Sequence, residues 1–332
     1  MIIVTGGAGF IGSAVVRRLN LLEREDILIV DHLGTGDTWK NLAPLRFRDY
    51  LEKDEFLRLI GQEEFPGLPR KGSNGIDAII HLGACSSTTE QDASYLIRNN
   101  FEYSKQLALF ALRNGARFIY ASSAATYGDG GKGFFDDEGR LDELRPLNMY
   151  GYSKQLFDMW AKANGLLERI VGLKYFNVFG PNEYHKADMR SLVVKAYEQI
   201  AASGEIRLFR SHRDNYANGE QKRDFLYVQD AADMTLHFLT NRSMNGIFNI
   251  GSGQANTWKS LATAIFKSLG KQERIEYIDM PETIRDKYQY YTCADITSLR
   301  RAGYDKQPTP LEKAIEEYVI DYLVPRKRLG EE

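Results

Sequence analysis

The chain begins with an apolar run that leads directly into a glycine-rich turn. Residues Met1 to Val4 are all apolar, and Gly6, Gly9 and Gly12 follow at a spacing of three. After a buried strand, this spacing lets the backbone turn tightly, approach a pyrophosphate closely and seat the next helix against the strand. The N–H groups at the start of such a helix favour an anion. The pattern therefore predicts a nucleotide-binding βα unit at the N-terminus.

A second signal separates this prediction from a simple tight turn. A dinucleotide-binding unit also carries an acidic residue at the end of its second strand, about 20 residues further on. The apolar run 27–30 is followed by Asp31, at the position that this rule requires. A carboxylate there can accept hydrogen bonds from ribose hydroxyls. The glycine spacing and the acidic residue at the expected distance together predict dinucleotide binding.

Composition limits the other functions. With 332 residues, 43% of them hydrophobic, the chain can bury one large core or two smaller ones. A formal net charge of −2 predicts neither a nucleic-acid surface nor attraction to an anionic membrane. No segment is typical of a signal peptide or a membrane span, so we expect a cytoplasmic protein without a membrane partner. Cys85 and Cys293 are far apart and the five histidines are scattered, so we expect neither a disulfide nor a metal site.

Segments that suit strands alternate with amphipathic segments through the first half of the chain. This alternation is typical of parallel βαβ units and predicts an α/β fold with a Rossmann-like, doubly wound parallel sheet. The expected strands are residues 1–5, 27–31, 77–81, 117–121 and 170–175, and the expected helices lie within 93–114 and 151–164.

The pattern loosens after Gly180 and Pro181. Residues 210–222 are nearly all polar and predict an exposed loop, whereas strand character returns at 224–228 and 246–250. Residues 309–312 have the composition of a capping box that opens a last helix toward Leu323. We predict a dinucleotide-binding domain and a smaller, interwoven C-terminal substrate-binding domain, made of residues 1–176 and 222–252 and of residues 177–221 and 253–332, respectively.

The segment YGYSK, residues 150–154, carries the clearest catalytic signal. On a helix, residues four apart share a face, so Tyr150 and Lys154 can point into one site. A free tyrosine, with a pKa near ~10, is a poor base at neutral pH, but a neighbouring ammonium favours the phenolate. The simpler alternative is a half-buried aromatic beside a lysine that covers apolar surface. Ser122 and Ser123 at the end of the preceding strand supply a hydroxyl beside the tyrosine and favour catalysis.

These motifs together resemble the extended short-chain dehydrogenase/reductases, the group that contains nucleotide-sugar epimerases and dehydratases. The resemblance covers essentially the whole chain and rests on TGGAGFIG (5–12), SSAATYG (122–128), YGYSK (150–154), YFNVFGP (175–181) and RDF (223–225). In that family a serine, a tyrosine and a lysine form the catalytic triad, which corresponds here to Ser123, Tyr150 and Lys154.

Two further segments are similar to the ADP-L-glycero-D-manno-heptose 6-epimerases within this group. They are HLGACSSTTE (81–90) and EYHK (183–186). The resemblance implies conversion of ADP-D-glycero-β-D-manno-heptose to its L-glycero epimer at C6″ for the lipopolysaccharide inner core. A 6″-keto intermediate and return of the hydride would invert a carbon whose proton is not acidic. Tyr150 would remove the hydroxyl proton and Lys186 would act as a second acid/base, although an ordinary surface lysine is the simpler interpretation.

The same resemblance implies two sets of binding residues. Those expected at the cofactor are Gly6, Gly9, Phe10, Ile11, Gly12, Asp31, His32, Lys53, Leu82, Gly83, Ala84, Cys85, Ser86, Asn99 and Lys154. Those expected at the ADP-heptose are Asn177, Asp188, Lys195, Phe209, Arg210, Ser211, His212, Arg223 and Tyr288. A guanidinium fork such as that of Arg223 suits a diphosphate. Asp188 and Lys195 depart from the family pattern, which has a serine and a histidine there.

For the choice between NADP and NAD, the residues of this chain and the family resemblance favour different cofactors. Asp31 favours NAD because its charge would repel a 2′-phosphate, whereas the family resemblance implies NADP. Lys53 and Lys40 could offset the repulsion, so we predict NADP, with NAD as the alternative. The resemblance also implies a homo-oligomer, in particular a homopentamer.

Other functions remain open at this point. Another nucleotide-sugar epimerase would share the cofactor and the triad, and so would a 4,6-dehydratase. A dehydratase needs an acidic pair after Ser123, where this chain has Ala124 and Ala125. A non-catalytic, dinucleotide-sensing regulator would keep the fold but has no reason to retain Tyr150 and Lys154.

Overall fold

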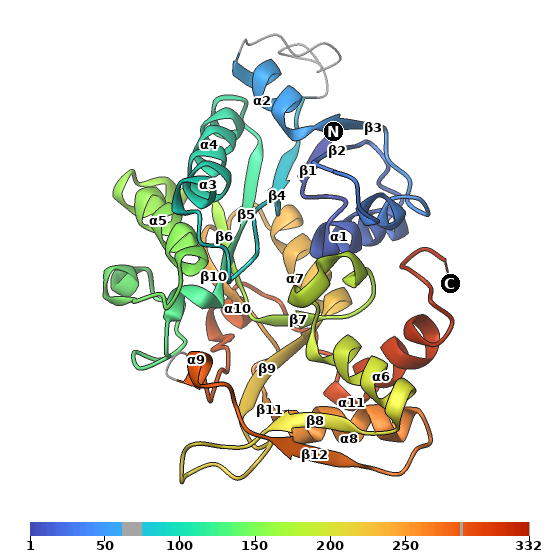
Figure 1. The fold of residues 1–332 in the computed structure, drawn as a ribbon. Coiled ribbons are helices and arrows are strands. Elements are labelled where there is room, and N and C mark those ends of the chain that lie inside the picture. The colour runs from blue at the N-terminus through green and yellow to red at the C-terminus, as the bar shows by residue number, and fades with distance from the viewer. Residues whose placement is uncertain (62–74, 286–287, 332) are drawn as a thin grey trace.

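A parallel sheet of seven strands organises the computed structural model, which describes residues 1–61, 75–285 and 288–331 (Figure 1). The strand order is β10-β6-β5-β4-β1-β2-β3, and every neighbouring pair runs parallel. The order reverses between β1 and β4, where doubly wound sheets bind their ligands. This confirms the predicted α/β, Rossmann-like fold. The strands are β1 (Ile2–Thr5), β2 (Ile27–Asp31), β3 (Asp49–Glu52), β4 (Ala78–His81), β5 (Arg117–Ser123), β6 (Val171–Tyr175) and β10 (Gly246–Ile250).

Helices cover both faces of this sheet, which is why its strands are apolar runs without alternation. Successive side chains of a strand point to opposite faces, so Ile2 and Val4 enter one core and Ile3 enters the other. Helices α1 (Phe10–Leu21) and α7 (Val228–Thr240) cover the first face. The second face is covered by α2 (Lys53–Gly61), α4 (Tyr103–Arg113) and α5 (Met149–Ala163).

A smaller region lies beyond the carboxyl edge of the sheet, at the bottom of Figure 1. One sheet orders as β11-β9-β7, and a second pairs β8 with β12. The strands are β7 (Asn177–Phe179), β8 (Ile206–Phe209), β9 (Lys222–Tyr227), β11 (Ala255–Thr257) and β12 (Ile275–Ile278), and the helices are α6 (Leu192–Ser203), α8 (Trp258–Ser268), α9 (Glu282–Arg285) and α11 (Leu311–Glu317). Helix α10 (Thr297–Arg301) instead packs against β10 of the large sheet. Residues 210–221 form the irregular, mostly exposed loop that we predicted. Within the described ranges, no helix is both long and apolar enough to span a membrane.

Six strands differ from the sequence analysis, which placed no strand at β3, β7, β8, β11 or β12 and grouped β9 differently. The strand β3 was missed because its sequence, Asp-Tyr-Leu-Glu, is half exposed at the sheet edge and has no apolar run. The strand predicted at 224–228 exists as β9 but pairs with β7 and β11, whereas the domain prediction had grouped it with the dinucleotide-binding part. The domain boundaries therefore remain a prediction.

The predicted capping box does not form. Helix α11 begins at Leu311 with Pro310 at its N-cap, and no side chain caps it. The N–H and hydroxyl of Thr309 instead donate to the Asp230 carboxylate at 2.7 and 3.0 Å. The helix itself is where the sequence predicts it, and residues Tyr318–Leu323 continue it as a π-helix. A charged tertiary acceptor on α7 outcompetes the local cap because hydrogen bonds to ionised groups are stronger.

A fully buried ion pair joins β6, the second strand from one edge of the sheet, to α5. Lys174 of β6 lies 2.8 Å from Asp158 of α5, and both side chains are 0% exposed. Tyr120 and Ser122 of β5 donate to the same carboxylate at 2.9 and 2.7 Å, and Lys174 also donates to the Thr126 hydroxyl at 2.7 Å. Because a charge in the core is costly unless its partners are in place, this network holds β5, β6 and α5 in one arrangement.

Replacing Lys174 with Met should destabilise the fold strongly, because Asp158 would be left buried without its counter-ion. We expect a loss of about 3 to 5 kcal/mol in the free energy of unfolding, measured by chemical denaturation. The control is Lys267→Met, which breaks an exposed ion pair with Glu312 and should change stability by at most about 1 kcal/mol. Equal effects of the two substitutions would contradict the role of the buried pair.

Candidate active site

The glycine-rich turn after β1 fits the cradle of a dinucleotide phosphate. Gly6 has a φ of +69°, which favours glycine, and its N–H donates to Val30 at 2.8 Å. A Cβ on Gly12 would lie 2.0 Å from the Gly6 carbonyl oxygen. Helix α1 starts at Phe10 with Gly9 as its N-cap and no side-chain cap, so its first N–H groups face the turn. The turn leaves no room for a side chain at Gly12.

A cavity of about 210 Å³ lies at the carboxyl ends of β1, β2 and β4. Of the predicted cofactor residues, it is lined by Gly6, Asp31, His32, Lys53, Gly83, Ala84, Cys85 and Asn99. Val30, Tyr95 and Tyr103 also line it and were not predicted. Their signal in the sequence is weak, because an apolar or aromatic residue in an amphipathic segment is most simply a core residue.

Asp31 is anchored at the mouth of this cavity. Its two carboxylate oxygens accept the N–H groups of Ala8 and His32, each at 2.8 Å. Burial raises its pKa, and the backbone N–H groups oppose that rise. Glu52 of β3 is its register partner, and Lys53 donates to Asn99 at 2.7 Å across the cavity. Asp31 and Lys53 therefore line the position expected for the ribose, and the Glu52 charge acts on Asp31 from the neighbouring strand.

The four predicted catalytic residues line one cavity of about 410 Å³. Ser123 comes from the end of β5, Tyr150 and Lys154 from α5, and Lys186 from the segment Tyr184–Met189 in the smaller region. Phe10, Ile11, Leu82, Ala84, Ser86 and Asn177 also line this cavity. The structure therefore brings together four predicted catalytic side chains that span 63 positions of the sequence, from Ser123 to Lys186.

The start of α5 orients Tyr150 and Lys154. Asn148 is the N-cap, and its side chain accepts the N–H of Gly151 at 2.8 Å. A Cβ on Gly151 would lie 2.7 Å from the Ala125 carbonyl oxygen, so glycine allows the helix to approach the end of β5 closely. One turn later, the Lys154 ammonium donates to the Ala121 carbonyl at 2.9 Å. Lys154 is thereby tied to the same strand that carries Ser123.

The electrostatics differ from what the YxxxK motif predicted. Burial raises the pKa of Tyr150, and an interaction with the Ser123 hydroxyl opposes the rise. Burial lowers the pKa of Lys154 to about 8, and the nearby Asp158 carboxylate opposes that shift. We expected the Lys154 ammonium to stabilise the Tyr150 phenolate, but in the protein without ligands the effect of burial on both pKa values is larger. Desolvation is the larger effect because both side chains leave water.

Asn100, a buried asparagine that we did not single out from the sequence, links the loop after β4 to α5 beside the catalytic cavity. Asn100 is 1% exposed, accepts the N–H of Cys85 and donates to the Cys85 carbonyl, both at 2.9 Å. Its amide also donates to Ser153 of α5 at 3.0 Å. In the sequence, Asn100 could have been noticed only as a polar residue among the apolar positions of the predicted helix within 93–114. Asn100 fixes the loop after β4 relative to α5.

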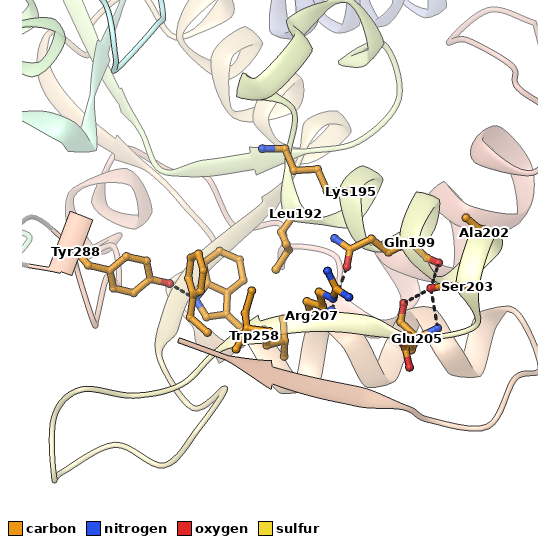
Figure 2. A pocket seen from close by; sticks show the side chains of 12 residues that line it. Leu192, Lys195, Gln199, Ala202, Ser203, Glu205, Arg207, Trp258 and Tyr288 are labelled. Atoms are coloured by element: carbon orange, nitrogen blue, oxygen red, sulfur yellow. Dashed lines mark hydrogen bonds between the residues drawn. The ribbon is translucent and has the colours of Figure 1, made fainter. Parts of the chain in front are cut away.

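A larger cavity of about 760 Å³ adjoins the catalytic one, and Leu192 and Trp258 line both. Figure 2 shows it between α6, β8 and the Trp258 ring, with Lys195 and Tyr288 among its lining residues. Phe209 lines it as well, and the Trp258 indole donates to the Tyr288 hydroxyl at 2.9 Å. Three predicted substrate residues, Lys195, Phe209 and Tyr288, thus share this cavity, and Asn177 lies in the catalytic one.

The remaining predicted substrate residues line none of these three cavities. Arg223 is buried, and its guanidinium lies 5.6 and 5.2 Å from the ring centres of Trp258 and Tyr288. It donates to the carbonyls of Lys222 and Gln289, so it braces these aromatic rings. The other four make contacts within the protein: Arg210 with Asp279, Ser211 with Asn218 and Arg213, His212 with Tyr290, and Asp188 with Lys195. Their contact with a substrate stays a prediction.

Comparison with known proteins agrees with this geometry. Residues 2–251 match the model of the NAD dependent epimerase/dehydratase family. The chain belongs to this family, which confirms the resemblance to extended short-chain dehydrogenase/reductases. As a member, it uses a nicotinamide dinucleotide as its cofactor.

Several similar relatives belong to one kind of enzyme within this family. The curated ADP-L-glycero-D-manno-heptose-6-epimerase of Nitratidesulfovibrio vulgaris (strain DP4) is 52% identical over 323 residues, 97% of this chain and 98% of the relative. That of Fusobacterium nucleatum subsp. nucleatum is 44% identical over 97% and 98% of the two chains. The crystal structure of the Helicobacter pylori ADP-L-glycero-D-manno-heptose-6-epimerase superposes with a TM-score of 0.78 at 26% identity, covering 96% of this chain and 94% of that one.

The burial of Lys154 predicts a pH-dependent stability. Its pKa falls from 10.5 in the unfolded chain to about 8 in the fold. Between these values the unfolded chain binds more protons, so the free energy of unfolding rises with pH. Relative to Lys154→Met, the wild type should gain about 3 kcal/mol from pH 8 to 10.5, measured by denaturation without dinucleotide. Lys162→Met, a partly exposed lysine of the same helix, is the control. A difference that is constant with pH would contradict this prediction.

Proposed function

We propose that this chain is an ADP-L-glycero-D-manno-heptose 6-epimerase that acts in lipopolysaccharide inner-core synthesis. The observation that carries the proposal is the position of Lys186, which lines the same cavity as Tyr150 but comes from a different part of the chain. In the scheme proposed here, the oxygen on the inverted carbon changes position between loss and return of the hydride, so a second proton-transfer group is needed where the oxygen arrives. The names of the curated relatives, at 44% and 52% identity over nearly the whole chain, support the same substrate.

The chemistry follows from the carbon that is inverted. C6″ carries a hydroxyl and has no adjacent carbonyl, so direct removal of its proton is implausible. When bound, the nicotinamide supplies a hydride acceptor that returns the hydride within the same turnover. Tyr150 takes the hydroxyl proton, Ser123 hydrogen-bonds the same oxygen, and Lys154 holds positive charge beside them. The resulting 6″-ketone is planar, so a hydride returned to its other face produces the epimer.

Lys186 supplies the proton transfer at the second position of the oxygen. Burial lowers its pKa, and the Glu183 carboxylate opposes the shift. Its ammonium lies 5.3 Å from the centre of the Phe10 ring, at the start of α1. A lysine whose pKa moves toward the working pH can both donate and accept a proton. Rotation about C5″–C6″ would carry the oxygen from Tyr150 toward this amine.

For the cofactor we propose NADP, with NAD as the alternative. The family resemblance supports NADP, and Lys53 in the cavity supplies a positive charge for a 2′-phosphate. NAD is favoured by the register pair of Asp31 and Glu52, which would repel that phosphate. Lys40 does not offset them, because it pairs with Asp37 at 2.9 Å. The homopentamer remains a proposal that follows from the same resemblance, and the cytoplasmic location remains a proposal that follows from the sequence, in which no segment is typical of a signal peptide or a membrane span.

A 4,6-dehydratase and a regulator are the alternatives. A dehydratase would need an acid pair beside the triad, and Ala124 and Ala125 follow Ser123 where this pair would lie. A regulator would need neither Tyr150 nor Lys154 in the cavity that both of them line. A single assay separates the three, because only the epimerase converts ADP-D-glycero-D-manno-heptose to the L-glycero product.

Lys186→Met and Tyr150→Phe should each abolish epimerisation, because each removes a proton-transfer group. We expect losses of about 100-fold or more in kcat, measured by chromatographic separation of the two epimers. Lys267→Met, an exposed lysine of α8, is the matched control and should keep wild-type activity. Wild-type turnover by Lys186→Met would disprove the two-base scheme, and wild-type turnover by Tyr150→Phe would disprove the oxidation itself.

The dinucleotide released from the purified protein by denaturation should be NADP, identified by mass spectrometry. The removal of one negative charge in Asp31→Asn should weaken NAD binding and improve the relative affinity for NADP, since the carboxylate both accepts ribose hydroxyls and repels a 2′-phosphate. Titration of the stripped protein with each dinucleotide measures this ratio. Recovery of NAD alone would establish the alternative cofactor.

A further inference from the structure

One buried carboxylate shapes the segment that carries Lys186. Glu183 is 1% exposed and accepts hydrogen bonds from both ends of this segment. At one end the Gly180 N–H donates to Oε1 at 3.2 Å. At the other end the Ser191 hydroxyl donates to Oε1 at 2.7 Å, and the Ser191 N–H donates to Oε2. Two residues eleven positions apart are thus tied to one side chain.

The same carboxylate connects the segment to the C-terminal helix. Tyr318 of the π-helix that follows α11 donates to Glu183 Oε1 at 3.2 Å. The neighbouring Tyr184 donates to the Lys327 carbonyl at 2.9 Å, and the Asn182 side chain accepts the Leu329 N–H at 3.0 Å. The segment is therefore held against the end of the chain, outside the large sheet.

The backbone within this closed segment is strained beside Lys186. Ala187 has φ 45° and ψ −122°, a conformation that residues with a Cβ rarely adopt. Such a conformation persists only where surrounding contacts determine it, and it is common at active sites. Arg190 contacts Ala187 directly, since its N–H and guanidinium donate to the Ala187 carbonyl, and Glu183 holds the two ends of the segment at Gly180 and Ser191.

We propose that Glu183 is a positioning residue for Lys186: it holds the amine in the catalytic cavity and places a fixed negative charge beside it. This inference rests on the proposed acid/base function of Lys186. Two of the four donors to Glu183 are backbone N–H groups, which can only donate, so the carboxylate form satisfies them best. Glu183 lines none of the cavities described above and touches no substrate position; it acts through Lys186.

Several titratable groups besides Glu183 lie around Lys186 and bear on its pH profile. The segment of residues 180–191 also carries His185 and Arg190. The catalytic cavity that Lys186 lines is also lined by Arg190 and by Tyr150 and Lys154 of α5. Phe10, which faces the amine from α1, carries no charge. Arg328 of the C-terminal residues acts on His185 and Tyr184. Burial lowers the pKa of His185 to about 4, so this side chain is neutral around neutral pH. Asp188 also lies on this segment, but Glu183 is the carboxylate whose charge opposes the fall in the pKa of Lys186.

The test compares Glu183→Gln with Glu138→Gln in the full-length protein with its dinucleotide. Glu138 is a matched control, because its carboxylate also accepts a backbone N–H, that of Ile247 at 3.0 Å, but at the opposite, amino edge of the sheet. We expect Glu183→Gln to lower kcat by roughly 10- to 100-fold with little change in KM, since a displaced acid/base slows the reaction more than it weakens binding. The control should keep the wild-type kcat.

The pH profile separates a positioning charge from a merely structural contact. Loss of the Glu183 charge favours the neutral amine of Lys186, so the limb of the kcat profile that belongs to Lys186 should move to lower pH in Glu183→Gln. Glu183→Asp keeps the charge and should leave that limb nearer its wild-type position. If Glu183→Gln does not fold, Ser191→Ala with Tyr318→Phe loosens the carboxylate but keeps its charge. That double variant should lower kcat without moving the limb.

The outcomes distinguish this inference from the function on which it rests. If Lys186→Met keeps turnover, the acid/base function of Lys186 fails and the positioning role fails with it. If Lys186→Met is inactive while Glu183→Gln matches Glu138→Gln in kcat and pH profile, only the positioning role is overturned. The same holds if the double variant keeps the wild-type kcat.

Discussion

The buried ion pair of Lys174 and Asp158 is the interaction on which the catalytic half of this molecule depends. It joins β6 to α5, and the hydroxyls of Tyr120 and Ser122 bring β5 into the same network. These elements carry Ser123, Tyr150 and Lys154. A buried pair costs desolvation energy, and a well-packed apolar core would be at least as stable. Its effect here is a specific arrangement: the carboxylate of α5 accepts three hydrogen bonds from two strands, β5 and β6, in only one relative position.

Desolvation sets the chemistry of the same side chains. The pKa of Lys154 falls to about 8, and the pKa of Tyr150 rises, because both lie away from water beside a cavity. The ammonium of Lys154 is kept near Ser123 by the Ala121 carbonyl, and Asp158 is one helical turn away. The network that orders the core thus also favours the charged form of Lys154.

The second half of the site is built by different means. Lys186 reaches the cavity from a short segment that no regular sheet supports, and its backbone is strained at Ala187. Hydrogen bonds to Glu183 and contacts with the C-terminal residues take the place of a sheet there. The neighbouring cavity of about 760 Å³ shares Leu192 and Trp258 with the catalytic one, so a sugar nucleotide can lie across both.

The sequence by itself determined the elements whose signals are local. The glycine spacing, Asp31 and the apolar runs predict the parallel sheet and the turn, because a strand buried on both faces must be apolar and a close phosphate approach excludes side chains. The spacing of Tyr150 and Lys154 places both on one helix face. Only the tertiary structure decided the partners of polar groups: Thr309 bonds Asp230 in place of a cap, Arg223 braces aromatic rings, and Lys174 finds Asp158. Those contacts join distant residues, and burial reverses the expected shift at Tyr150, so no local pattern contains them.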